Sequence, residues 1–419
     1  MIVLPRRMAA GRCISPLGRS VLWRVLSVRD KGRYAIKFAA NPHFHFSPQV
    51  ELRVTAHPYW LQQQVFTMAS RKKRNHFIPR ALLNRFSSRS EPKRGIYWIW
   101  WHPTDGESKE VSTRDVGLGK FFYGKEVDLE EQFAVIEGQL GSALAAIDQS
   151  GCTDDYEVFL NDYTWVQAIR TRSFRERFRQ TAERVFVGAA NKAHSDEAKL
   201  SFKNAANEQI ASFASQFSPE QLALIQSRLG DIPLNEFLDT SIKKEIESGV
   251  FSSIFERHLR AFAQGDDLIK GVEKGHQTAL SQMLTESKIS PDKFQAKWIL
   301  RRYPSESLIL GDSCIFTLDS QNLPHPLNDA INWTTLYFPI SPTQCLIGHR
   351  TRESALLTAA QINVASAKSS LEQFFACKKN EEILALKSLV EANTEMLSAV
   401  EIDDVTSSVW RRLPRLRTD

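Results

Sequence analysis

Apolar residues recur at intervals of three and four through the middle of the chain, and this spacing sets the architecture. Between about residues 126 and 148 they form one narrow stripe, made by Leu129, Phe133, Ile136, Leu140, Leu144 and Ile147. Because an α-helix turns by ~100° per residue, this stripe predicts an amphipathic helix with one buried face. Similar patterns predict a second long helix over 155–187 and further helices over 195–215, 218–229, 234–264 and 266–288.

The pattern changes to short strands late in the chain. Strand-like runs separated by turns lie at about 295–302, 307–310, 314–318, 334–340 and 344–349, and helices are expected again over 353–376 and 379–398. Near the start, an aromatic run over 96–101 and a second strand over 108–112 predict a small N-terminal hairpin. We therefore predict an α+β fold that is mainly α, with long helices packed against this hairpin and a late group of mostly antiparallel strands.

Positive charge is concentrated in residues 1–67. They hold ten of the 54 Lys and Arg residues but only two of the 48 Asp and Glu residues, so they carry +8 while the remainder carries −2. We expect this basic extension to be disordered, or to precede a true start of translation at Met68. We expect residues 68–400 to form one globular domain and residues 401–419 to form a basic C-terminal tail, which is frayed over its last ten residues, WRRLPRLRTD.

Composition and missing motifs disfavour several classes of protein. The 42% hydrophobic content is that of a globular protein, and no apolar run reaches the ~18 residues of a membrane-spanning helix. The five cysteines form no CxxC pair, which indicates reduced thiols and a cytoplasmic location. The sequence also lacks the GxxxxGKS/T, GxGxxG, HExxH and GxSxG motifs of common ATPases, oxidoreductases, metalloproteases and hydrolases.

Three polar residues stand in surroundings that need an explanation. Arg170 lies at the centre of the apolar face of the second predicted helix, so its guanidinium must meet a carboxylate or a polar cavity. Glu130 and Glu137 on the preceding helix are the candidate partners, and such a pair is either structural or functional. His76 stands at the mouth of a short helix. Asp312 interrupts apolar strands after a glycine, where it is either a site residue or a turn former.

The order of several motifs resembles a bacterial family, the domain of unknown function 4238. The segment Asn75-His76-Phe77-Ile78-Pro79-Arg80, with Leu83 and Phe86, resembles its opening HxxPxxxLxxF pattern. Later matches are an aromatic strand over 97–101, Phe122-Tyr123, Glu130 and Glu137, Gln167-x-x-Arg170, Phe174-Arg175, Trp298, Asp312, Pro339–Pro342 and Asn363. The resemblance covers about residues 70–380 and implies no particular activity. The chain departs from the family where Thr171 replaces a frequent proline and where Asp312-Ser313-Cys314 replaces Asp-x-Pro.

Three classes of function remain open, and the first of them is preferred over the second. The first is an enzyme acting on a phosphodiester, a nucleic acid or another anionic substrate, with a divalent metal such as Mg²⁺ as a candidate cofactor. Its candidate catalytic residues are His76, Glu137, Arg170 and Asp312, and its candidate binding residues are Glu130, Arg80 and Gln167. The second is a non-catalytic binding or regulatory protein in which the same residues form a buried polar network. The third is nucleic-acid binding by the Arg-rich N-terminal segment and Arg71–Arg74. No membrane partner is expected.

Overall fold

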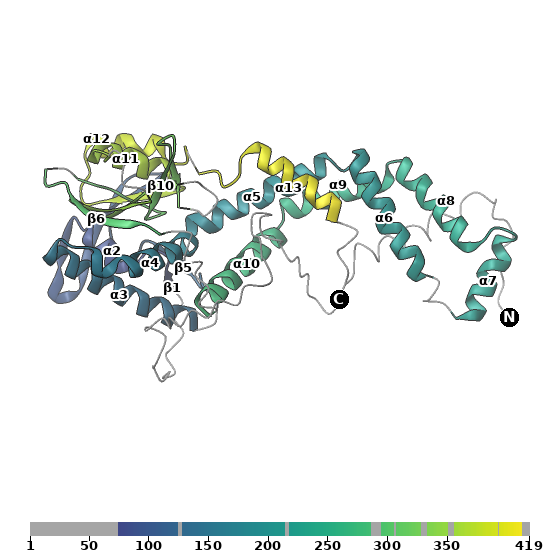
Figure 1. The fold of residues 1–419 in the computed structure, drawn as a ribbon, viewed down its shortest axis with the longest axis horizontal. Coiled ribbons are helices and arrows are strands. Elements are labelled where there is room, and N and C mark those ends of the chain that lie inside the picture. Colours follow the sequence, from purple (N-terminus) through teal and green to yellow (C-terminus); the bar gives the residue numbers. More distant parts are fainter. Residues whose placement is uncertain are drawn as a thin grey trace. The chain divides into compact units, whose positions relative to one another are not determined.

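The computed structural model describes residues 74–124, 128–213, 218–285, 295–305, 307–327, 333–350, 356–392 and 394–412. The expected basic extension and the start at Met68 lie outside these residues. The chain forms two compact units (Figure 1). Unit 1 includes Thr181–Gly271 and the chain from Leu397, and unit 2 includes the described chain up to Gln180 together with Val272–Met396. One family domain can contain both units, so the expected boundaries at 68 and 400 stay a prediction.

Unit 2 combines long helices with three small sheets. Its helices are α2 (Arg80–Arg85), α3 (Asp128–Ser150), α4 (Glu157–Arg170), the first part of α5 (Arg172–Asn191), the last part of α10 (Asp266–Thr285), α11 (Ala359–Lys368) and α12 (Glu381–Ala385), with 3-10 turns η1 (Pro92–Arg94), η2 (Asp154–Tyr156) and η4 (Leu386–Leu389). The expected stripe on α3 is confirmed, because all six of its apolar side chains are buried.

All pairings between the described strands are antiparallel, which confirms the expected α+β class. The first sheet pairs β1 (Arg74–His76) with β5 (Leu118–Lys120). The second runs in the order β2 (Arg89–Glu91), β3 (Ile96–Pro103), β12 (Gln373–Ala376), β7 (Leu310–Gly311), with β4 (Lys109–Ser112) beside β3. The third runs in the order β6 (Lys297–Arg302), β11 (Gln344–His349), β10 (Trp333–Ser341), β8 (Phe316–Asp319), β9 (Pro324–Pro326).

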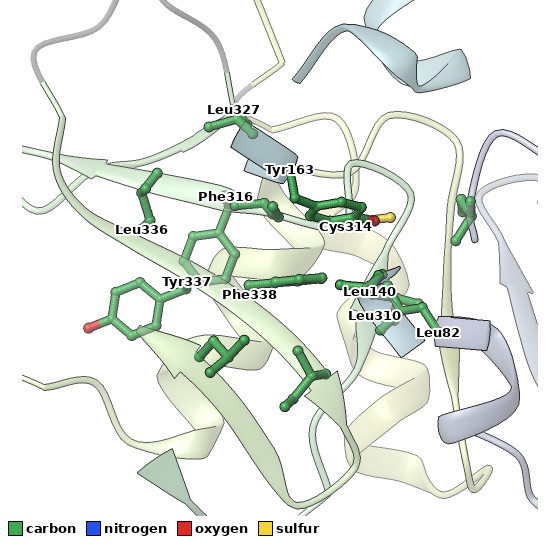
Figure 2. Close-up of a cluster of buried hydrophobic side chains, with 14 of the residues drawn as sticks. Leu82, Leu140, Tyr163, Leu310, Cys314, Phe316, Leu327, Leu336, Tyr337 and Phe338 are labelled. Carbon is green, nitrogen blue, oxygen red and sulfur yellow. The ribbon is translucent and has the colours of Figure 1, made fainter. Parts of the chain in front are cut away.

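One hydrophobic core joins these elements within unit 2. Leu82 of α2, Leu140 of α3, Tyr163 of α4 and Phe338 of β10 meet there, each at most 1% exposed (Figure 2). The fully buried thiol of Cys314 lies beside Tyr163 in the same core. Burial of this kind is the main favourable contribution to folding, and it fixes the positions of α3 and α4.

The predicted second long helix is wrong as a single element, because the chain breaks at Thr171. This residue is extended (φ −76°, ψ 155°), and its hydroxyl accepts a hydrogen bond from the Phe174 backbone N–H at 3.1 Å. Thr171 therefore ends α4 and caps the start of α5. Gly249, at φ 76°, similarly divides the helix expected over 234–264.

Two late predictions are also corrected. The helix expected over 353–376 ends at Lys368, and Gln373–Ala376 instead form β12, where Phe374 and Phe375 are fully buried between β3 and β7. The helix expected over 379–398 is reduced to α12 and η4. Short buried strands and helix ends share the same apolar composition, so periodicity alone does not separate them.

Unit 1 is entirely helical in its described residues. It contains the end of α5, α6 (Asp196–Phe213), α7 (Pro219–Leu229), α8 (Leu234–Glu247), α9 (Val250–Ala263), the start of α10 and α13 (Ala399–Arg412). The expected frayed tail is wrong for residues up to 412, because α13 inserts Trp410 into a core with Phe202 and Phe255. Trp410 is fully buried, and its carbonyl accepts a hydrogen bond from Ser201.

Within the described ranges, none of the helices combines the length and the hydropathy needed to cross a lipid bilayer. The cytoplasmic location stays a prediction.

The cap at Thr171 gives a direct test of the helix break. Replacing Thr171 with Ala removes the acceptor for the Phe174 N–H, and we expect a loss of about 1 kcal/mol of unfolding free energy. Thr171→Ser keeps the acceptor and should stay within about 0.5 kcal/mol of the original protein. Urea denaturation of both variants measures the difference. Equal stability of the two variants would contradict the capping role.

Candidate functional site

Arg170 is the centre of a buried polar cluster in unit 2. It is the last residue of α4, and it is 1% exposed. Its Nε donates to the Tyr123 hydroxyl at 2.7 Å, and its Nη2 donates to the His76 carbonyl at 2.8 Å and to Glu137 Oε1. The guanidinium also lies over the Phe133 ring, 4.5 Å from its centroid. The prediction that this cation must meet a carboxylate of the preceding helix is confirmed, with Glu137 as the partner.

His76 joins this cluster through its main chain. Its carbonyl accepts hydrogen bonds from Arg170 and from the Tyr123 hydroxyl, the latter at 2.7 Å. Tyr123 reaches it from a tight loop after β5, in which Phe121 (φ 50°) and Gly124 (φ 91°) adopt left-handed conformations. Burial raises the pKa of Tyr123, so its hydroxyl stays protonated and can donate. His76 as a whole is half-buried, and the contacts described here are made by its main-chain carbonyl.

Glu130 connects β1, the strand that ends at His76, to α3. Its Oε2 accepts a hydrogen bond from Asn75 Nδ2 at 2.8 Å, and it lies two helical turns before Glu137. Asn75 is 4% exposed, whereas the Glu137 side chain keeps 22% of its surface exposed. Glu130 and Glu137 therefore connect β1 to α3 at two points, one through Asn75 and one through Arg170.

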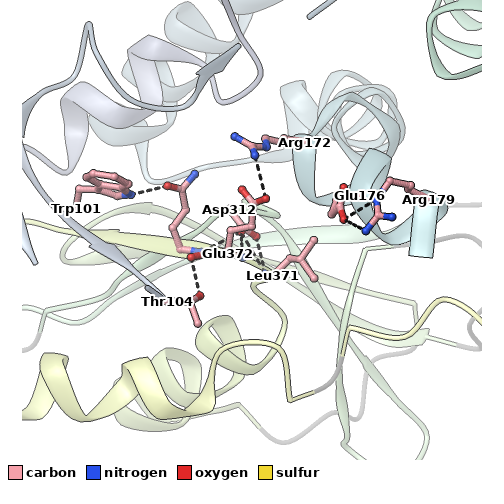
Figure 3. A network of polar contacts seen from close by, with 9 residues as sticks. Trp101, Thr104, Arg172, Glu176, Arg179, Asp312, Leu371 and Glu372 are labelled. Carbon is pink, nitrogen blue, oxygen red and sulfur yellow. Dashed lines mark hydrogen bonds and ion pairs between the residues drawn. The ribbon is translucent and has the colours of Figure 1, made fainter. Parts of the chain in front are cut away.

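Asp312 binds a different segment of the chain, the residues that lead into β12. It follows β7, is 2% exposed, and accepts hydrogen bonds from the backbone N–H groups of Leu371, Glu372 and Gln373 (Figure 3). The shortest of these bonds, from Glu372, is 2.7 Å. Burial raises the pKa of Asp312, while the three N–H groups and the Arg177 charge act in the opposite direction. Asp312 thus organises the chain that leads into β12, about 60 residues away in sequence, and its hydrogen bonds are not those of the Gly-Asp turn that the sequence offered as an alternative.

The structure does not place Asp312 in direct contact with the other candidate catalytic groups. Among the described residues, it makes no hydrogen bond or ion pair with Glu137 or Arg170. Both Asp312 and Arg170 nevertheless lie close enough to the buried Cys314 thiol to affect its pKa, which burial raises. The two charged groups therefore belong to neighbouring parts of one interior.

Arg177, on α5, is a second buried guanidinium. It is 1% exposed, and its Nε donates to the Ser173 carbonyl at 3.2 Å. Burial lowers the pKa of Arg177 to about 10, and the neighbouring Asp312 opposes that shift. The Ser173 and Ser313 hydroxyls, 3.2 Å apart, link α5 to the same loop.

The two remaining candidate binding residues lie in different places. Gln167 is fully buried one turn before Arg170, where its Oε1 accepts a hydrogen bond from the Tyr163 hydroxyl at 3.0 Å. Arg80 donates from Nη2 to the Gly95 carbonyl at 2.9 Å and holds the turn before β3. Gln167 therefore shares the interior with Arg170, whereas Arg80 stabilises a separate loop.

Sequence reasoning missed a buried histidine. His276 of α10 is 2% exposed, its Nε2 donates to the Ile169 carbonyl at 2.6 Å, and its Nδ1 accepts from Arg175 Nε at 2.9 Å. Arg175 in turn stacks on Phe122, 3.6 Å from its ring centroid. Burial lowers the pKa of His276 to about 3, and the Arg175 charge adds to this. The signal was present, since His276 lies four residues from both Val272 and Leu280 on an apolar face.

The described part of the chain contains no group of three His, Cys, Asp or Glu side chains arranged to hold a metal ion. The roles assigned to the candidate residues in catalysis, and the Mg²⁺ expectation, stay predictions.

The buried neutral His276 predicts a pH dependence of stability. Between pH 6.5 and about 3 the unfolded chain binds a proton that folded His276 excludes, so the unfolding free energy falls as the pH falls. The full contribution of one such proton is ~1.4 kcal/mol per pH unit. We expect His276→Gln to show a shallower loss of stability between pH 7 and 5 in urea denaturation.

The exposed His258 supplies the control, because His258→Gln should keep the original slope. A His276→Gln slope equal to that of the unmodified protein would show that His276 is not held neutral.

Comparison with known proteins agrees with the motif order. A family model described as "Protein of unknown function (DUF4238)" matches residues 74–370, close to the expected 70–380. No curated protein and no solved structure matches the chain significantly. The match extends from β1, which ends at the histidine of the His–Pro opening, to the residues just before β12. The chain belongs to the DUF4238 family of proteins of unknown function.

Proposed function

We propose that the protein is a non-catalytic binding or regulatory protein, in which His76, Glu137 and Arg170 form one structural polar cluster and Asp312 organises a separate segment. The observation that carries this proposal is the state of Arg170. Its guanidinium is 1% exposed and already donates to a carbonyl, a hydroxyl and a carboxylate of the chain itself. A cation that serves as an anion clamp must present donors to its substrate, and this one presents them to the protein interior.

Other residues that match the family pattern support the same reading, because they satisfy main-chain groups of distant segments. Asn363 accepts from the Ile309 N–H at 2.9 Å and donates to the Ser307 carbonyl at 2.8 Å. In the matching segment Pro339–Pro342, the carbonyl of Ile340 accepts a hydrogen bond from Arg85 Nε at 2.7 Å. Buried main-chain groups need such partners. The matching residues therefore support the proposal that the family pattern specifies a scaffold.

A second function is favoured by one observation at the edge of this network. The Glu137 side chain is partly exposed, and Glu130 on the same helix and His76 on β1 are half-buried. An enzyme using these groups, with Mg²⁺ or as general acid and base, would act on a phosphodiester of nucleic acid or on a small anionic molecule.

Two substitutions separate the functions. Arg170→Met leaves Glu137 and two acceptors without their partner, and we expect a loss of about 3–5 kcal/mol, seen as a fall in melting temperature of roughly 10 °C. His76→Ala keeps the carbonyl that Arg170 binds, so its loss should stay below about 1 kcal/mol. Calorimetry of both variants measures these changes.

The same preparations are assayed for cleavage of single-stranded RNA, DNA and a phosphodiester model substrate, each with Mg²⁺ and with EDTA. The proposal expects no cleavage by the unmodified protein. Cleavage by the unmodified protein that His76→Ala abolishes, while its melting temperature stays unchanged, would establish the enzyme instead.

A further inference from the structure

Strand β3 carries two half-buried tryptophans, Trp98 and Trp100, on one face of the second sheet. Successive residues of a strand point to opposite faces of its sheet. Ile99 is fully buried in the core of unit 2, and Trp101 packs against the same core. Trp98 and Trp100 therefore share the face that points away from this core, where their positions are about 7 Å apart along the strand.

A positively charged side chain lies over each of these two rings. The Arg89 guanidinium is 4.0 Å from the centroid of the Trp98 ring, and the Lys379 ammonium is 5.4 Å from the centroid of the Trp100 ring. Arg89 lies directly opposite Trp98 on the neighbouring strand β2, and its side chain is 58% exposed. Lys379 is exposed as well. Each cation is therefore held over an aromatic ring and can still reach a ligand from solvent.

The face becomes covered on one side of Trp100. Ala376, which lies opposite Trp100 on β12, is fully buried and belongs to a separate hydrophobic cluster with residues of α12 and η4. On the other side of Trp100 lies Glu110 of β4, whose carboxylate forms an ion pair with Arg89 at 2.9 Å. The two tryptophans therefore lie next to the covered part of the sheet, and one acid lies beside their two cations.

Positive charge predominates at this end of the sheet. The turn η1, which joins β2 to β3, carries the exposed Lys93 and Arg94. Arg94 forms an ion pair with Glu91 at 3.1 Å. Together with the two cations over the rings, these residues make four bases against the two acids Glu91 and Glu110.

The combination of aromatic rings and cations favours one kind of partner. A pair of exposed tryptophans can bind a proline-rich peptide or unstacked bases. Cations beside the rings favour a partner in which flat rings are joined by negative charges. Single-stranded nucleic acid has both features, because its bases stack on aromatic side chains and its phosphates bind Lys and Arg.

We propose that this face of β3, with Trp98, Trp100, Arg89 and Lys379, binds single-stranded nucleic acid. Each tryptophan stacks against one base, and the two cations contact the phosphates beside those bases. This inference supplies a partner for the binding protein proposed above and rests on that proposal.

Fluorescence anisotropy of the full chain with a labelled single-stranded oligothymidylate tests the inference. We expect binding that weakens as the salt concentration rises, because phosphate contacts release counterions. Trp98→Ala and Trp100→Ala should each weaken binding by about tenfold, which is the loss expected for one stacked base. Lys379→Ala changes an exposed residue, so it tests the face even where a tryptophan variant fails to fold. It should weaken binding and reduce the slope of log affinity against log salt by about one.

Lys109→Ala is the matched control, because Lys109 lies over Trp101 on the opposite face of β3, 4.9 Å from its ring centroid. This variant should bind as tightly as the unmodified protein. A proline-rich peptide is titrated in parallel, and its binding in place of the oligonucleotide would overturn the inference.

The inference is also overturned if the unmodified protein does not bind the oligonucleotide, or if the tryptophan and Lys379 variants bind it as tightly as Lys109→Ala does. The second result would assign the binding to another segment of the chain. Neither result affects the proposal of a non-catalytic protein, because the cleavage assay tests that proposal separately.

Discussion

The arrangement of unit 2 depends on one buried cation. The Arg170 guanidinium binds groups that lie 94, 47 and 33 residues away in sequence, on β1, on the loop after β5 and on α3. A charge removed from water is tolerated only when its hydrogen bonds are well satisfied. Displacing any one of these segments would leave the buried guanidinium without one of its partners, which costs free energy. This cost holds the three segments in place against α4.

Asp312 is a buried anion, and its charge is likewise tolerated because its hydrogen bonds are satisfied. Its carboxylate gathers three consecutive backbone N–H groups at the start of β12, and Arg177 lies close enough to offset part of the cost of its burial. Arg170 ends α4 and Arg177 lies in the second turn of α5, so the break at Thr171 separates two buried cations.

The sequence was informative where a simple rule connects residue type to location. The stripe on α3 predicted a helix, and an arginine on an apolar face predicted a carboxylate partner, which is Glu137. Other features depend on main-chain groups, which any residue supplies. The His76 carbonyl that accepts from Arg170 and the backbone N–H groups that donate to Asp312 are of this kind. The side chains at those positions therefore gave no indication of these hydrogen bonds. The break at Thr171 and the strand Gln373–Ala376 were missed because a cap and a four-residue strand leave almost no periodic signal.

Arg170 connects α4 to the other segments of unit 2, both directly and through Tyr123. A double-mutant cycle between Arg170→Met and Tyr123→Phe, followed by urea denaturation, measures this connection most directly. The account predicts a coupling energy of about 1–3 kcal/mol, because the two side chains share a hydrogen bond and the same carbonyl acceptor. Additive losses, with no coupling between the two substitutions, would contradict it.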